Sequence, residues 1–236
     1  YGRIPATNDT VVIDGKKDEV YNDGLTIAID QKENSNADTA TNGKAVLLWN
    51  GTDTLYVYCE VYDEDMVMYE GTPNAWDTDS VEFFIDYSNK AARTRDQYRI
   101  DLKGIATYYD TQGYTGDETR KFGFENWAAS KIDGGYSVEF EVRAYNEPIA
   151  ADMDIGVHFL INDMTSDGNH FCLHSDKCLN DPANFGFVTL SSETVTAVAE
   201  PDAPVSAATG DPATALAVVS ALSVCAAAVT RNSKKH

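Results

Sequence analysis

Basic residues are scarce in this sequence, which has 18 Lys and Arg against 38 Asp and Glu and a formal net charge of −20. A domain this acidic repels phosphate backbones, so the composition argues against a nucleic-acid partner. The surplus of carboxylates is compatible with a neutral ligand, with bound calcium, or with an acidic surface that serves only solubility.

The motifs of common catalytic sites are absent from the sequence. No GxSxG, HExxH or phosphate-binding glycine loop occurs along the chain. Glu139 and Glu141 share one strand face at a spacing near that of a glycosidase pair, yet they alternate with apolar residues as an ordinary solvated face does. We therefore predict that the domain is not an enzyme.

Long helical periodicity is also missing from residues 1–192. Short segments with two-residue alternation follow one another instead, separated by Asn-Gly, Asp-Gly and Gly-Gly turns. This pattern predicts an all-β fold, an antiparallel β-sandwich made of two packed sheets. The predicted strands are 10–13, 25–30, 44–49, 55–63, 80–87, 97–103, 105–110, 128–132, 136–144, 154–164 and 185–190.

Cysteines number only four. Cys59 alternates with apolar neighbours, which predicts a buried thiol. Cys172 and Cys178 lie close together in a polar stretch and are a candidate disulfide in an oxidising compartment. The array His170-x-Cys172-x-His174 also offers three ligands to zinc or copper, without the paired cysteine spacing of a typical zinc site.

Calcium suits the acidic composition better than a transition metal, because calcium takes hard oxygen ligands from loops. No EF-hand pattern is present, and the sequence selects no particular set among the candidates. A structural calcium ion would draw on the loop carboxylates Asp63, Glu64, Asp65, Asp77, Asp79 and Asp167.

The C-terminal residues differ in composition from the rest. Residues 193–212 are rich in Ala, Ser, Thr, Pro and acidic residues and lack aromatics, which predicts a flexible linker. Residues 213–230 form an apolar run without a charge, long enough for a hydrophobic helix that spans a membrane. The basic tail 231–236 then follows, as expected on the cytoplasmic side of a membrane.

This tail is similar to the sorting tails of Gram-positive surface proteins. A Thr-Gly pair at Thr209-Gly210 and an acidic residue at Asp211 precede the apolar run and the basic end. The resemblance implies an extracellular protein held at the cell surface by the membrane or the cell wall. We expect this chain to be the C-terminal part of a longer protein, and to be monomeric.

The candidate binding residues are concentrated in one stretch, residues 76–102. Its two alternating runs place Glu82 and Arg99 on the face of a sheet opposite to the core, with Trp76 at the rim. A carboxylate, a guanidinium and a flat ring suit the hydroxyls and the C–H face of a sugar. The alternative is a cross-strand ion pair on a solvated face, with Trp76 covering the edge of the core.

With these strands in place, residues 1–192 resemble a family 9 carbohydrate-binding module. The resemblance implies a β-sandwich that binds glucans, xylan or their oligosaccharides and that accompanies a glycoside hydrolase, such as a xylanase, located upstream. The matching pieces, in order, are IDGKKDEVY at 13–21, LYVYCEVYDED at 55–65, WDTDSVEFFID at 76–86, DQYRID at 96–101, IGVHFLINDM at 155–164 and FGFVTL at 185–190.

The resemblance also implies the residues of the sugar site. Trp76 would be one aromatic wall, while Glu82 and Arg99 would bind hydroxyls. Asn162 would add a further polar contact, and alternation places it opposite to the apolar face of its strand. Family members often have a second aromatic wall shortly before the closing strand.

Phe171 and His174 are the candidates for that second wall. Two other interpretations of the domain remain open. Related sandwiches carry haem in electron-transfer subunits, and Met66, Met68, His158 and His174 would be the candidate axial ligands. The last interpretation is a surface spacer without a ligand.

Overall fold

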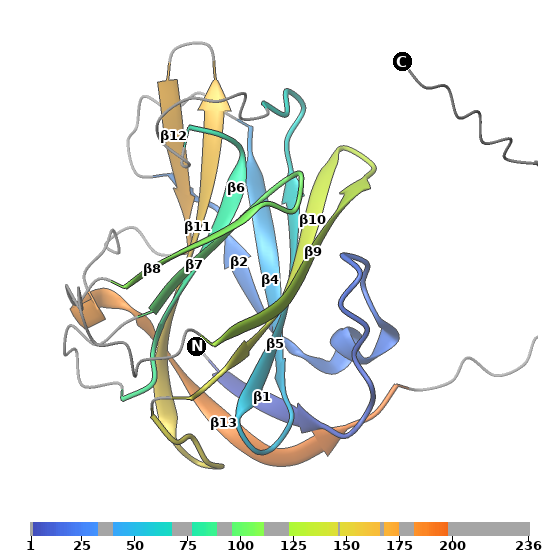
Figure 1. The fold of residues 1–236 in the computed structure, drawn as a ribbon, viewed down its shortest axis with the longest axis vertical. Coiled ribbons are helices and arrows are strands. Elements are labelled where there is room, and N and C mark those ends of the chain that lie inside the picture. The colour runs from blue at the N-terminus through green and yellow to red at the C-terminus, as the bar shows by residue number, and fades with distance from the viewer. Residues whose placement is uncertain are drawn as a thin grey trace, which may run out of the picture. The chain divides into compact units, whose positions relative to one another are not determined.

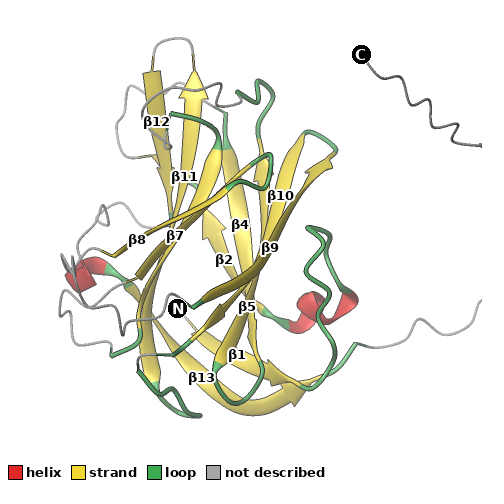
Figure 2. Cartoon of the chain, viewed as in Figure 1, coloured by secondary structure: helices red, strands yellow, loops and turns green. Residues whose placement is uncertain are grey.

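The computed structural model describes residues 2–32, 40–67, 77–88, 96–110, 123–145, 147–165, 168–174 and 182–197. In these ranges the chain is all-β, as predicted, with two short 3-10 helices as its only helical turns (Figure 2). The elements are β1 (Gly2–Thr7), η1 (Glu19–Asp23), β2 (Leu25–Ile29), β3 (Gln31–Lys32), β4 (Asn42–Trp49), β5 (Thr54–Tyr62), β6 (Ser80–Asp86), β7 (Asp96–Asp101), β8 (Ala106–Asp110), β9 (Phe124–Ile132), β10 (Gly135–Arg143), β11 (Asp154–Thr165), β12 (Gly168–Leu173), η2 (Pro182–Asn184) and β13 (Gly186–Val195).

The strands form one hydrogen-bonded path in the order β8-β7-β6-β11-β13-β1-β4-β5-β10-β9 (Figure 1). The path folds over so that its two halves face each other across a common core. Phe83 of β6 packs against Phe140 of β10 with ring centroids 5.7 Å apart, and Tyr98 of β7 stacks on Phe124 of β9 at 5.0 Å. Two layers are therefore present as predicted, but the described strands join them into a single sheet.

The prediction of purely antiparallel pairing is wrong at β1. This strand runs parallel to both of its neighbours, β13 and β4. No short hairpin connects β1 to either neighbour, so no tight turn dictates the relative direction of the strands. The predicted strand at 10–13 is not a strand in the structure; the first strand is Gly2–Thr7.

The core forms where two-residue alternation predicted it. Val57 and Cys59 of β5 and Val138 of β10 are fully buried, and the register of the hairpin places Val138 opposite Cys59. Burying each large aliphatic side chain contributes about 1.5–3 kcal/mol. The predicted turn before β10 is confirmed by Gly134, whose φ of 73° is one that glycine adopts without strain.

The final strand continues beyond the predicted end of the domain at 192, because β13 runs to Val195. The chain divides into a compact unit, Tyr1–Ala199, and a second unit, Glu200–His236, which lies outside the described residues. The predicted segments 213–230 and 231–236 belong to that second unit. Within the described ranges no helix is long and apolar enough to cross a membrane.

Candidate functional site

A polar cluster lies on the outer face of the neighbouring strands β7, β6 and β11. Register places Arg99 opposite Glu82, and Asn162 opposite Ser80. Asn162 Nδ2 donates to Glu82 Oε1 at 2.8 Å and to Ser80 Oγ at 3.1 Å. Arg99 Nη1 lies 3.7 Å from Glu82 Oε1, and Gln97 Nε2 donates to Glu82 Oε2. Three of the residues predicted from the sequence thus meet around one carboxylate.

This cluster is more enclosed than the sequence suggested. Glu82 is 5% exposed and Asn162 is 1% exposed, whereas alternation predicted an open, solvated face. The guanidinium of Arg99 is held from its other side by Thr107 of β8, with Nε 2.9 Å from Oγ1. Burial lowers the pKa of Arg99, and the neighbouring Glu82 opposes that shift. A site this enclosed strengthens each polar contact and holds the donors and acceptors in fixed positions.

Sequence reasoning missed two members of the cluster, Gln97 and Thr107. Gln97 lies on the same face as Arg99 because the two are two residues apart in β7, so alternation alone contained that signal. Thr107 reaches Arg99 only through the pairing of β7 with β8, in which the two residues are opposite each other. That pairing carries no local signature in the sequence.

An apolar surface adjoins the polar cluster. Phe84, Leu160, Leu173 and Phe185 form one buried group on this side of the sheet, and the half-buried Phe171 packs against it. Phe171 lies on β12 directly opposite Asn162. Of the two candidates for a second aromatic wall, Phe171 is therefore next to the cluster.

His174 occupies a different kind of position. It is 7% exposed, and its Nδ1 lies 2.7 Å from Nδ1 of His158 while accepting the backbone N–H of Phe159 at 3.1 Å. Burial lowers the pKa of His174 to about 4, so the ring is neutral at physiological pH. A buried imidazole held in this way does not present its flat face to a sugar, which corrects the predicted binding role of His174.

The same contact bears on the haem alternative. The Nδ1 atoms of His158 and His174 are too close together to bind one iron from opposite sides. Met66 packs against the hydrophobic core, and Met68 lies outside the described residues. The structure brings no axial ligand pair together from this set in the part of the chain that it describes.

The predicted disulfide and transition-metal array are not formed. Cys172 is a free, buried thiol whose Sγ donates to the Ile29 carbonyl at 3.2 Å, and Cys178 lies outside the described residues. Cys172 faces the core, whereas His174 follows the end of β12 and turns toward His158. The alternation that would have aligned the three ligands ends with the strand at Leu173. Trp76 also lies outside the described residues, as does Asp167.

Three carboxylates form the one candidate metal-binding group that the described residues contain. Asp63, Asp79 and Asp163 are all buried, and each offers an oxygen within 4.8 Å of the others. Each continues the inward-facing parity of its strand, so the three meet at one end of the core, between the two layers. The sequence analysis named Asp63 and Asp79 but missed Asp163, although its alternation with Ile161 placed it on the core side.

The electrostatics of this acidic cluster favour a cation. Burial, together with repulsion from Asp63 and Asp163, raises the pKa of Asp79 to about 7. Backbone N–H groups of Met164 and Val67 donate to Asp79, whereas Oδ2 of Asp163 is buried without a hydrogen-bond partner. An unpaired buried carboxylate oxygen is costly, and a hard divalent cation satisfies such oxygens.

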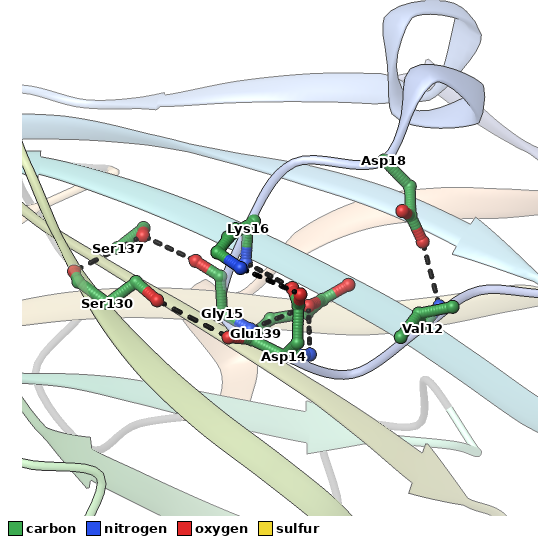
Figure 3. A network of polar contacts seen from close by, with 8 residues as sticks. All are labelled: Val12, Asp14, Gly15, Lys16, Asp18, Ser130, Ser137 and Glu139. Carbon is green, nitrogen blue, oxygen red and sulfur yellow. Dashed lines mark hydrogen bonds and ion pairs between the residues drawn. The ribbon is translucent and has the colours of Figure 1, made fainter. Parts of the chain in front are cut away.

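A second buried carboxylate lies on the outer face of the other layer. Glu139 is fully buried, because the loop around Asp14 and Gly15 covers it, and both backbone N–H groups donate to its Oε2 at 3.0 Å (Figure 3). Ser137 Oγ donates to the Gly15 carbonyl at 2.6 Å. Burial raises the pKa of Glu139 to about 7. The sequence interpretation of Glu139 as part of a solvated face is wrong, while Glu141 is half-exposed.

Comparison with known proteins was made by family and by relatives. A family model described as carbohydrate family 9 binding domain-like matches residues 13–193. Endo-1,4-beta-xylanase A of Thermotoga maritima is 28% identical over 190 residues, covering 77% of this chain and 17% of that protein. Exoglucanase XynX of Acetivibrio thermocellus is 28% identical over 190 residues, covering 78% of this chain and 17% of that protein. The chain thus spans less than a fifth of the length of these relatives.

Solved structures with the same fold include a family 9 carbohydrate-binding module from Caldicellulosiruptor kristjanssonii in complex with cellotriose. It is 26% identical with a TM-score of 0.64, and the match covers 85% of this chain and 100% of that one. A structure of such a module from the same organism with glucose is 25% identical, with a TM-score of 0.63 and coverage of 84% and 100%. A putative carbohydrate-binding protein from Bacteroides uniformis, at 9% identity and a TM-score of 0.59, shares the fold alone.

Proposed function

This chain belongs to the carbohydrate family 9 binding domain-like family, and from that membership we propose that its polar cluster binds β-linked glucan and xylan oligosaccharides. The domain is a non-catalytic carbohydrate-binding module. The observation that carries the proposal is the convergence of Glu82, Arg99 and Asn162 on one sheet face beside an apolar surface.

The chemistry of the cluster matches that of sugar hydroxyls. A carboxylate accepts hydrogen bonds, a guanidinium donates them, and a carboxamide does both, so the set serves hydroxyls in either role. Glu82 acts as the central acceptor, with Arg99 and Asn162 on either side. We assign the apolar contact with the C–H face of the ring to Phe171 on β12, and a second wall to Trp76 on the basis of the sequence.

The longer protein that contains this module is a further part of the proposal. Relatives such as the Thermotoga maritima xylanase are about six times as long as the matched region, since that region is 17% of the protein. We propose that this module accompanies a secreted glycoside hydrolase and holds it on plant polysaccharide. The tail at 213–230 and 231–236 then anchors the protein at the surface of a Gram-positive cell.

The acidic cluster has a structural role in this proposal. Asp63, Asp79 and Asp163 hold a calcium ion that ties the end of β5 to β6 and β11. Carboxylate oxygens are the ligands that calcium prefers, and three negative charges in a buried site favour a divalent cation over a monovalent one. This ion stabilises the fold at a place separate from the Glu82 cluster.

Calorimetric titration with cellotriose and xylotriose tests the binding site. Glu82→Gln keeps the size of the side chain but removes the charge, and loss of hydrogen bonds to a charged group costs about 1.5–3 kcal/mol, so affinity should fall at least tenfold. Glu141→Gln, the same change at a half-exposed carboxylate of the other layer, should leave affinity unchanged. Equal affinity for wild type and Glu82→Gln would refute the assignment, and no binding by the wild type to either sugar would refute the function.

A further inference from the structure

An exposed tryptophan far from the core of the argument above has an unusually rigid setting. Trp127 on β9 is 41% exposed, yet its ring stacks on Phe124 with centroids 4.8 Å apart and an interplanar angle of 12°. Phe124 in turn stacks on Tyr98 of β7 at 5.0 Å. The indole is therefore held flat at the outer end of a three-ring ladder that begins in the core.

The polar edge of the same indole is already engaged. Nε1 of Trp127 donates to the Gly104 carbonyl at 3.1 Å, which joins β9 to the turn between β7 and β8. With one ring face packed and the N–H bonded, the surface that Trp127 leaves to solvent is apolar ring. Ile105, which follows Gly104, is 54% exposed and extends this apolar surface.

The position of this surface relates it to the polar cluster. Ile105 immediately precedes β8, and Thr107 of that strand accepts the hydrogen bond from Arg99. Two residues of extended strand span about 7 Å, so the apolar surface begins a short distance along β8 from the residue that holds Arg99. The two surfaces share the β7–β8 hairpin, and a chain of sugars longer than the cluster can contact both.

We propose that Trp127 and Ile105 form a platform that binds further units of a polymeric β-linked glycan whose first units occupy the Glu82 cluster. The inference rests on the proposed function and extends it. A flat, immobile apolar ring contacts the C–H face of a pyranose without losing side-chain freedom on binding. Because the N–H of Trp127 is used within the chain, the platform contributes affinity for polymers and little selectivity between hydroxyl patterns.

The test compares a short and a long ligand. Trp127→Ala should bind soluble xylan and mixed-linkage β-glucan about two- to tenfold more weakly than wild type, the range expected for one aromatic contact. Its affinity for cellotriose should stay within twofold of the wild-type value, because cellotriose fills the cluster alone. Tyr62→Ala, the loss of a comparably exposed aromatic at 40% on β5, is the matched control and should change neither affinity.

A second variant guards against misfolding, since Trp127 covers Phe124. Ile105→Ser alters a side chain that is mostly in solvent, and it should also weaken polymer binding without changing cellotriose binding. Wild-type polymer affinity in both folded variants would overturn the platform while cellotriose binding still supports the Glu82 site. A wild type that binds neither ligand would overturn the proposed function and the platform with it.

Discussion

Asp163→Asn is the substitution that probes the acidic cluster most directly. The side chain keeps its shape and loses the charge whose Oδ2 has no hydrogen-bond partner. At the 4.8 Å limit that relates Asp163 to Asp63 and Asp79, two unit charges repel by about 3 kcal/mol at an effective dielectric of 20. Relaxation and partial protonation reduce this value, so we expect the metal-free variant to be about 1–2 kcal/mol more stable than wild type at pH 8.

The effect of pH has a definite sign. Because the pKa of Asp79 is raised to about 7 in the folded state, the folded protein holds this proton more tightly than the unfolded chain does. The metal-free protein therefore loses stability as the pH rises from about 4 through about 7, by at most about 4 kcal/mol. The advantage of Asp163→Asn over wild type should shrink at pH 5, where Asp79 is protonated.

Thermal unfolding followed by circular dichroism, with EDTA or excess calcium at pH 5 and pH 8, measures these effects. A stability change of 1 kcal/mol shifts the Tm of a domain this size by roughly 2–4 °C. Calcium at a hundred times its Kd should stabilise the wild type by about 2.7 kcal/mol, and it should have little effect on Asp163→Asn. Asp65→Asn, the same charge change at an exposed neighbour, is the control. A lower Tm for Asp163→Asn in EDTA at pH 8, or an undiminished calcium response, would refute the reasoning.

Three further predictions concern other buried groups. Glu139→Gln should raise the Tm at pH 8 and flatten its dependence on pH, because the pKa of about 7 makes the wild type lose stability as pH rises from about 4.5 through about 7; equal pH profiles in melting experiments would contradict this. Cys172 should resist alkylation at pH 8 until the protein is unfolded, since burial raises its pKa to about 11, and peptide mass spectrometry would detect early labelling. Gly15→Ala should cost more than Gly134→Ala in chemical denaturation: both residues have positive φ, worth about 1–2 kcal/mol, but a Cβ at Gly15 would also lie 2.8 Å from the Ala129 carbonyl carbon. Equal costs would show that this close approach is relieved without strain.

The binding cluster could be predicted in part. Two-residue alternation placed Glu82 and Arg99 on the face opposite the core, and the family resemblance added Asn162. Alternation reports only which face a side chain occupies, and it says nothing about what lies above that face. The burial of Glu82 and the support of Arg99 by Thr107 depend on contacts between strands, so they were missed.

His174 and Phe171 show the same limit at a finer scale. Both are rings in one short polar stretch, and the sequence offered either as a second wall. β12 ends at Leu173, so Phe171 keeps its strand position opposite Asn162 while His174 turns to meet His158. A strand end is decided by pairing partners, here β11 and β3, which the local sequence does not contain.

The sequence by itself determined the all-β class, the core positions of the strands and the family, because period-two alternation and turn residues are local properties written along the chain. The tertiary structure alone decided which polar groups are buried and with what partners. Glu139 and Glu141 have nearly the same sequence surroundings, yet only Glu139 is covered by the loop at Asp14 and Gly15. Burial of a surface position requires another part of the chain to dock on it, and that docking, like the meeting of three aspartates from three strands, arises from long-range packing.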